Sequence, residues 1–270
     1  MKIRENNGKM TGLSLFVVKG FSMIIAASTS CMPGESLADV FDRLADMEYT
    51  STELVVGEHG SLQPSQIAEN HEAIVQLRRS SRRILPIGIY FDVEPEAPNY
   101  IEHFTAACRL AKDCKIAVIT VHAAVLGMPF NEEIERLQEL VKIGVYYGVV
   151  VGVATEGGRI TETPETVGSL CKYVKGLGVT LDPSHYIYNV SKPRDYEAIL
   201  PFVCHVRLRD TTQKHFQTRV GQGIVDFGRL IALLTNVEYQ RVLCVDLAVL
   251  PDVDQLGELR KMRLLLESSL

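Results

Sequence analysis

The segment "VTLDPSHY", residues 179–186, runs from a strand-like apolar stretch directly into a polar turn. Asp182 and Pro183 follow the apolar residues at once, and His185 comes three places after the acid. Asp and Pro commonly end strands by ordinary turn chemistry. The segment alone therefore has two interpretations: a plain turn, or a polar site built where a buried strand ends.

The same kind of apolar run recurs along the chain, mostly at intervals of about 30 residues, the length of one strand–helix unit. Most runs are apolar on both faces, as expected for parallel strands covered by helices. Eight strands are predicted, and they begin at Phe21, Ser51, Ile84, Lys115, Val149, Gly178, Val203 and Arg241.

Helical patterns separate these runs. In "SLADVFDRLADMEY", residues 36–49, the apolar residues Leu37, Val40, Phe41 and Leu44 fall on one helical face. Only the connection near "SKPRDYEAILP", residues 191–201, is short. Eight alternations predict an α/β fold, a (β/α)8 TIM barrel in a single domain over residues 21–270, with residues 1–20 as an N-terminal extension.

Charge and cysteine content narrow the function classes. The formal net charge of −5 argues against nucleic acid as the main partner. The six cysteines are scattered without a C-x-x-C pair, which favours reduced thiols and a cytoplasmic protein. The basic and apolar N-terminus loosely resembles a signal peptide, but Lys19 and Gly20 interrupt its apolar run. No other segment reaches membrane-spanning length, so no membrane partner is expected.

Ionisable residues gather where the predicted strands end, which is where a barrel of this type carries its chemistry. Glu156 ends the fifth strand, Asp182 the sixth, and Asp246 interrupts the apolar eighth. His205, Arg207 and Arg209 alternate along the seventh and so share one face. His122 ends the fourth strand and Glu53 lies in the second; each is a candidate substrate contact, or a rim residue paired with a neighbour.

Glu156, Asp182, His205 and Asp246 come from four consecutive strands, so the closed barrel brings them together. Three crowded carboxylates repel one another unless a cation balances them. We therefore predict one divalent metal ion with three oxygen ligands and one nitrogen ligand. Such a site accepts Mn, Mg, Co or Zn, and the sequence does not choose among them.

Three motifs give the chain a family resemblance over residues 21–265: "TEGG" on the fifth strand, "LDPSH" on the sixth and "HVRLRDT…VGQGIVDF" on the seventh. Together they resemble the xylose isomerase-like TIM-barrel superfamily, which includes sugar isomerases, epimerases and endonuclease IV. The resemblance implies a single metal held by Glu, Asp, His and Glu from strands five to eight. Glu156 and Asp182 match the first two ligands, and His185 matches a substrate-contacting or auxiliary histidine.

Two positions depart from the family pattern. Arg207 stands where members commonly have the histidine ligand, so we expect His205, two residues earlier, to supply the imidazole, with help from His185. Asp246 stands where the family usually has Glu. The shorter acid can still bind metal, but it reaches less far toward a substrate carbon.

These residues predict an isomerase or epimerase that moves a proton next to the carbonyl of a small sugar or polyol. Glu156 and Asp246 are the expected acid–base pair, and Arg159, His185 and Arg207 are expected to hold the substrate. An inosose dehydratase-like lyase and a non-catalytic sugar-binding barrel are the alternatives. A nuclease is disfavoured because Thr212 stands where a further metal-binding histidine would be needed. A homo-oligomer is compatible with all of these.

Overall fold

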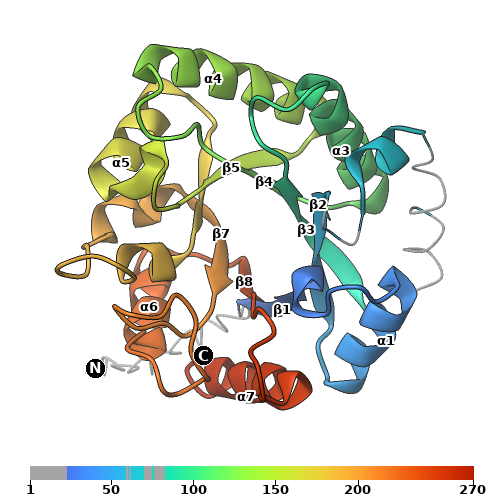
Figure 1. Cartoon of the computed structure of the whole chain (residues 1–270). Helices are drawn as coiled ribbons and strands as arrows, with labels where there is room; N and C mark the ends of the chain where they lie inside the picture. Colours follow the sequence, from blue (N-terminus) through green and yellow to red (C-terminus); the bar gives the residue numbers. More distant parts are fainter. Residues whose placement is uncertain (1–22, 59, 61, 70–74, 76–82) are drawn as a thin grey trace, which may run out of the picture.

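The computed structural model describes residues 23–58, 60, 62–69, 75 and 83–270. Within them, eight parallel strands pair in chain order and close into a barrel, with β8 returning to β1 (Figure 1). This confirms the predicted (β/α)8 TIM barrel. The predicted extension, residues 1–20, lies outside the described residues.

The strands begin close to the predicted positions. Their bounds are β1 Ile24–Ser28, β2 Ser51–Gly57, β3 Leu85–Asp92, β4 Val118–Val121, β5 Val150–Ala154, β6 Gly178–Leu181, β7 Val203–Leu208 and β8 Val242–Val245. Parallel strands bury both faces, which explains why the runs are apolar throughout.

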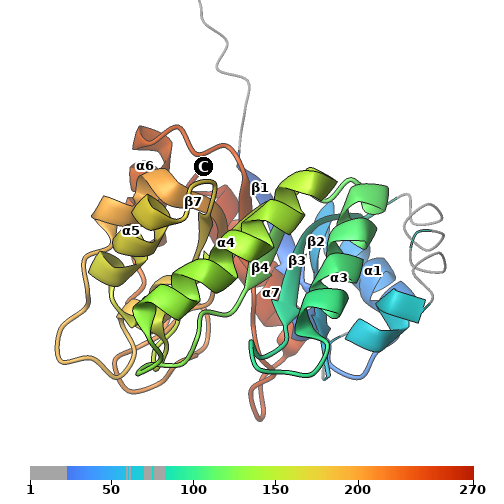
Figure 2. The same ribbon diagram turned by 90° about the horizontal axis from the view of Figure 1, so that it is seen from above.

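The helices form the outer layer of the barrel (Figures 1 and 2). Their bounds are α1 Leu37–Asp46, α3 Tyr100–Cys114, α4 Phe130–Tyr147, α5 Pro164–Tyr173, α6 Phe227–Asn236 and α7 Gln255–Glu267. Residues 64–69 are also helical. After β6, the chain forms only the 3-10 helices η3 Pro183–Tyr186 and η4 Glu197–Phe202 before β7, so this connection lacks an α-helix but is about as long as those after β1 and β5.

All six cysteines are free and buried, and several pack between layers. Cys204 on β7 fills the space left by two glycines: a Cβ added to Gly178 would stand 2.5 Å from its sulfur, and one added to Gly152 would stand 2.8 Å away. These two strand glycines therefore allow close packing inside the barrel. In the described part of the chain, no helix has the length and apolar character needed to cross a membrane.

The loop after β7 is built around one carboxylate. Asp210 accepts hydrogen bonds from the backbone N–H groups of Gly221 and Gly223, at 2.8 and 2.9 Å. Gly221 has a φ of +82°, and a side chain on Gly223 would collide with the carboxylate of Asp210. The Gly-x-Gly sequence is thus required by the backbone path, which folds the loop against the strand end.

Candidate active site

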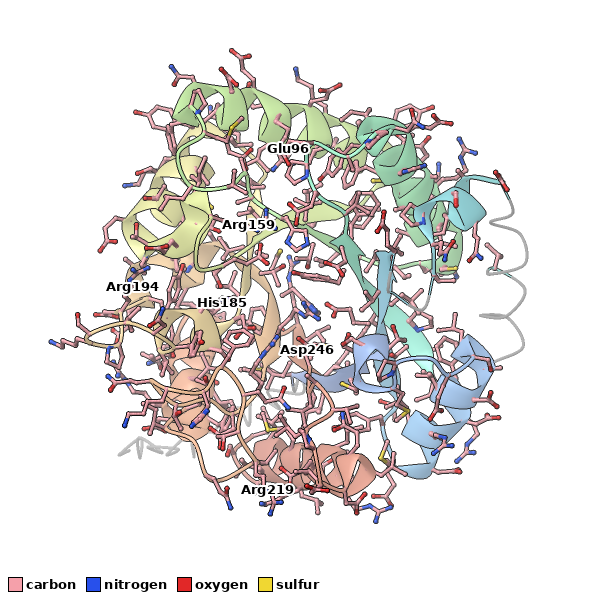
Figure 3. The ribbon with its side chains drawn as sticks, in the orientation of Figure 1. Glu96, Arg159, His185, Arg194, Arg219 and Asp246 are labelled. Atoms are coloured by element: carbon pink, nitrogen blue, oxygen red, sulfur yellow. The ribbon has the colours of Figure 1, made fainter. Side chains whose placement is uncertain are left out.

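A cavity of about 340 Å³ opens where β3 to β8 end and where the loop after β1 approaches them. That volume lies at the lower end of the range for small-molecule sites. Its ionisable lining includes four acids, two arginines and two histidines: Asp92, Glu156, Asp182, Asp246, Arg207, Arg209, His122 and His185. Figure 3 shows Asp246 and His185 close to the centre of the barrel and Arg194 and Arg219 farther out.

Glu156 follows β5 and is held by neighbours from three sides. Both of its carboxylate oxygens lie 2.9–3.0 Å from Nδ1 of His122, and the Tyr90 hydroxyl donates to Oε1 at 3.3 Å. Nε of Arg159 lies 3.2 Å from Oε2. Burial alone would raise the pKa of Glu156, but His122 and Arg159 outweigh it and lower the pKa below its usual value. Glu156 is therefore an ionised base at neutral pH.

Asp182 is at once a cap and a cavity residue. Its Oδ1 accepts from the backbone N–H of Ser184 at 2.9 Å, which caps η3, while its Oδ2 lies 3.0 Å from Nη2 of Arg209. Asp182 therefore caps the turn and also lines the cavity, so both interpretations of the "LDPSH" segment apply to the same side chain. In its predicted role as a metal ligand, Asp182 would have to give up the ion pair with Arg209.

His185 stands one step further along η3. The backbone N–H of Gly157 donates to its Nδ1 at 3.2 Å, and its Nε2 lies 4.0 Å from Oδ2 of Asp182. Burial lowers the pKa of His185, against the opposing effect of Asp182. The ring is therefore neutral at pH 7, and because Nδ1 accepts a hydrogen bond, its single proton resides on Nε2.

Asp246, directly after β8, lies between two guanidinium groups. Its Oδ2 is 3.1 Å from Nη2 of Arg207 and also pairs with Arg209, while its Oδ1 accepts from the Ser30 hydroxyl at 2.6 Å. Burial alone would raise the pKa of Asp246, but Arg207 and Arg209 prevail and lower it to about 2. The acid that stood out in the sequence is thus compensated by buried arginines.

His205 and Glu53 meet inside the barrel and do not line the cavity. Nε2 of His205 lies 2.8 Å from Oε2 of Glu53, and Oε1 of Glu53 lies 3.2 Å from Nε of Arg207. Gly88 on β3 gives the imidazole room, because a Cβ there would stand 3.3 Å from its ring. Arg207 outweighs the effect of burial and holds the pKa of Glu53 below its usual value.

Among the described residues, one group of three metal-binding side chains is compact: the ligand atoms of Glu53, His205 and Cys244 lie within 4.8 Å of one another. Burial raises the pKa of the Cys244 thiol well above its usual value, so the sulfur is protonated. A bound metal ion would itself displace this proton. Arg207, however, already pairs with Glu53 inside this group, and the buried guanidinium therefore favours a packed polar cluster over a metal centre.

The four predicted ligands do not fit a divalent ion in this arrangement. Each oxygen of Glu156, Asp182 and Asp246 already has a hydrogen-bond or ion-pair donor. The imidazole of His205 is paired with Glu53. An ion about 4 Å from one guanidinium would be repelled by about 8 kcal/mol at an effective dielectric constant of about 20. The cations that balance the crowded carboxylates here are arginines.

Sequence reasoning missed four contributors to the site. Asp92, which accepts from Nε2 of His122 at 2.9 Å, ends β3 and carries the same strand-end signal as the residues that were found. Tyr90 alternates with it along the strand. The sequence places Arg209 on the same strand face as His205 and Arg207 but assigns it no role in the site. Ser30 had no signal, because its role depends on β1 lying beside β8.

The His122 cluster predicts a pH-dependent stability. Burial alone would lower the pKa of His122, but hydrogen bonds to Asp92 and Glu156 raise it to about 9; Arg159 opposes them. A folded-state pKa above the unfolded value of about 6.5 contributes stability that is complete below pH 6.5 and is lost as the pH rises toward 9. The contribution is on the order of 3 kcal/mol. Melting curves from pH 6 to 10 should show this loss in the wild type and a flatter profile in His122→Gln. Parallel profiles would contradict it.

A second cavity of about 660 Å³ adjoins the first and shares His185 and Phe216 with it. Phe216 packs against the His185 ring at 4.7 Å between centroids and lies 4.5 Å from the guanidinium carbon of Arg209. The mouth of the barrel therefore continues outward along η3 toward Tyr188 and Arg194.

The structure is thus a closed (β/α)8 barrel whose strand ends carry acids, guanidinium groups and imidazoles around one polar pocket. The chain belongs to the xylose isomerase-like TIM barrel family, whose model matches residues 41–262. Comparison with curated proteins gave no match.

Solved structures share this fold at low sequence identity. A D-tagatose 3-epimerase-like protein is 19% identical with a TM-score of 0.71, covering 92% of this chain and 98% of its own. The 3-keto-D-glucoside 4-epimerase YcjR from E. coli is 13% identical with a TM-score of 0.72, covering 92% and 100%. The IOLI protein, solved with a bound zinc atom, is 14% identical with a TM-score of 0.71, covering 92% and 99%. At these identities the likeness shows the fold alone.

Proposed function

We propose that this protein is an isomerase or epimerase that acts on a small sugar or polyol by proton transfer next to a carbonyl group. One observation carries the proposal. The cavity places an ionised carboxylate, Glu156, in a pocket that also holds a neutral imidazole with its proton on Nε2, His185, and two guanidinium groups. These are a base, a hydrogen-bond donor and an electrostatic partner for a developing oxyanion.

Glu156 is the proposed base. Proton removal from carbon needs an ionised carboxylate that a substrate can reach, and Glu156 lines the cavity while His122, Tyr90 and Arg159 fix its orientation. Arg159 is predicted from sequence to hold the substrate. In the structure it bridges Glu156 and Glu94, so we assign it to positioning Glu156.

His185, whose ring lies beside the Glu156–Gly157 segment, is the proposed hydrogen-bond donor to the substrate. Gly157 holds its Nδ1, so the Nε2–H group is the one available to a hydroxyl or carbonyl oxygen of the substrate. Sequence reasoning predicts Asp246 as the second proton-transfer group. Because Arg207 and Arg209 both pair with Asp246 and lower its pKa to about 2, it is a weak base, and we assign it to orienting those arginines instead.

The substrate class rests on the size and polarity of the pocket. About 340 Å³ lined by acids, guanidinium groups and imidazoles suits a small, hydroxyl-rich carbonyl compound. The named epimerases among the similar folds support this class but do not identify the compound. The six buried free thiols support a reducing, cytoplasmic location as part of the same proposal.

A dehydratase is the second candidate, because removal of the same proton is also the first step of eliminating water from a hydroxylated carbonyl compound. The fold is shared with a probable 3-DHS dehydratase, AsbF, from Bacillus anthracis. Isomerisation and dehydration differ in whether the intermediate regains a proton or loses hydroxide. Products distinguish them directly.

A panel of ketoses, aldoses, keto-glycosides and inososes in deuterated water tests the proposal. Proton NMR should show enzyme-dependent loss of the carbon-bound proton next to the carbonyl in at least one compound. An epimer or isomer as product supports the leading proposal, and an unsaturated product supports the dehydratase. Binding of panel compounds without any exchange would favour a non-catalytic sugar-binding barrel.

A further inference from the structure

The centre of the site holds two buried guanidinium groups in fixed positions. Arg207 bridges Glu53 and Asp246, and Arg209 bridges Asp182 and Asp246. The Tyr90 ring covers the face of Arg207, at 3.7 Å from its guanidinium carbon, and Phe216 covers that of Arg209. The carboxylates at the edges of the two guanidinium groups and the aromatic rings on their faces together fix the orientation of both guanidinium planes.

Burying two arginines next to each other costs desolvation free energy, and apolar residues of similar volume could fill the same space in the barrel without that cost. Arg207 is 7% exposed, and its pKa stays well above the usual value because Asp246 and Glu53 outweigh the desolvation. Both arginines line the cavity. Each guanidinium has five N–H donors, and the contacts above use only part of them. N–H groups therefore remain for an oxygen atom in the cavity.

We propose that Arg207 and Arg209 do the work that a divalent ion would otherwise do, so that the reaction of this site requires no metal. They neutralise the carboxylates of Asp182 and Asp246 and donate hydrogen bonds to the carbonyl oxygen of the substrate. This inference rests on the proposed function for its chemical step. Its statement about metal binding stands on the ion pairs alone.

The step balances without a cofactor. The carbon–hydrogen bond next to the carbonyl breaks, and its proton goes to Glu156. The electron pair of that bond forms a carbon–carbon double bond, while the carbonyl π pair moves onto oxygen, giving an enediolate. The guanidinium groups hold that oxyanion, which planar N–H donors suit well. Glu156 then returns the proton to the neighbouring carbon of the enediolate, and the hydroxyl proton moves from that oxygen to the other, which gives the isomeric carbonyl compound and the ionised carboxylate again.

The site therefore favours substrates whose reacting oxygen becomes anionic in a planar system, such as a 2-keto or 3-keto sugar. It also favours compounds with a carboxylate beside the carbonyl, which a guanidinium pair can hold by two parallel hydrogen bonds. A substrate panel that contains both keto-sugars and keto-sugar acids shows which of these two kinds of compound the site accepts.

Metal titration tests the inference independently of any activity. Isothermal calorimetry with Mn²⁺, Zn²⁺, Co²⁺ and Mg²⁺ on the chelator-treated full chain should show no stoichiometric uptake by the wild type. Arg209→Met removes the cation between Asp182 and Asp246 and should gain one Mn²⁺ or Zn²⁺ per chain. Arg209→Lys keeps the charge and should gain none, and exposed Arg229→Met should behave as the wild type. Wild-type uptake of one ion that Asp182→Asn abolishes would overturn the inference.

Exchange measurements give the second readout. With chelator present, the wild type should retain its full rate of deuterium incorporation, and Arg209→Met should lose at least about 100-fold. Exchange that disappears on chelation and returns with metal would overturn this inference while leaving the proposed function in place. Exchange absent from every compound would reject the proposed function, and the titration would still decide whether arginines occupy the metal position.

Discussion

Arg207→Met is expected to lower the melting temperature by roughly 10 °C, the equivalent of about 3–5 kcal/mol. Met keeps the length and apolar contacts of the side chain but removes its charge. Glu53, which is completely buried, and Asp246 would then lose a cation inside the barrel. Breaking a buried ion pair by removing one partner costs far more than the pair itself contributes.

The matched control is Arg229→Met. Arg229 also pairs with a glutamate, Glu197, but the two side chains are 63% and 47% exposed. Exposed pairs contribute at most about 1 kcal/mol, so this variant should melt within a few degrees of the wild type. Equal, small shifts in both variants would show that the buried charge is unimportant.

A double variant keeps the prediction testable if Arg207→Met does not fold. Glu53→Gln combined with Arg207→Met removes one unpaired charge along with its partner. The double variant should be more stable than Arg207→Met alone, with a coupling of about 1–3 kcal/mol between the two positions. If the losses of unfolding free energy in the two single variants simply add in the double variant, the destabilisation does not come from the Glu53–Arg207 pair.

Glu156→Gln is expected to slow proton exchange into the substrate by about 10²–10⁴-fold. Gln keeps the size of the side chain and can still accept from Tyr90 or Arg159, but it has no basicity. Affinity for the substrate should change by less than about tenfold, so the loss falls on kcat. The two quantities come from exchange rates and calorimetric binding on the same preparations.

Glu197→Gln is the control for this substitution, because Glu197 is exposed and lies outside both cavities that meet at the barrel mouth. It should exchange protons at the wild-type rate. If Glu156→Gln also exchanges protons within about threefold of the wild type, Glu156 is not the base.

Most of the fold could be predicted because parallel barrel strands are apolar on both faces and recur at a fixed interval. β2, β6 and β7 begin at the predicted residues, and the remaining strands begin within three residues of them. The strand-end rule also located Glu156, Asp182 and Asp246, since a closed barrel brings the ends of β5, β6 and β8 to one mouth. These predictions needed only periodicity and topology.

The partners of these side chains could not be predicted in the same way. Whether His205 faces Glu53 or Asp182 depends on the stagger of strands around the barrel and on the space left by Gly88. Whether Arg207 and Arg209 point into the pocket depends on their rotamers and on Tyr90 and Phe216, which come from distant segments. Charge crowding led to the prediction of a metal ion, whereas in the structure two arginines at the end of the seventh strand pair with these carboxylates.

One measurement tests the proton-transfer proposal most directly: a proton NMR time course in deuterated water with chelator-treated wild-type protein and the panel compound that it converts. Proton transfer through Glu156 predicts that the carbon-bound hydrogen next to the carbonyl is replaced by deuterium at least as fast as product forms. Product that fully retains this hydrogen would indicate a hydride shift between carbons and would contradict the proposal.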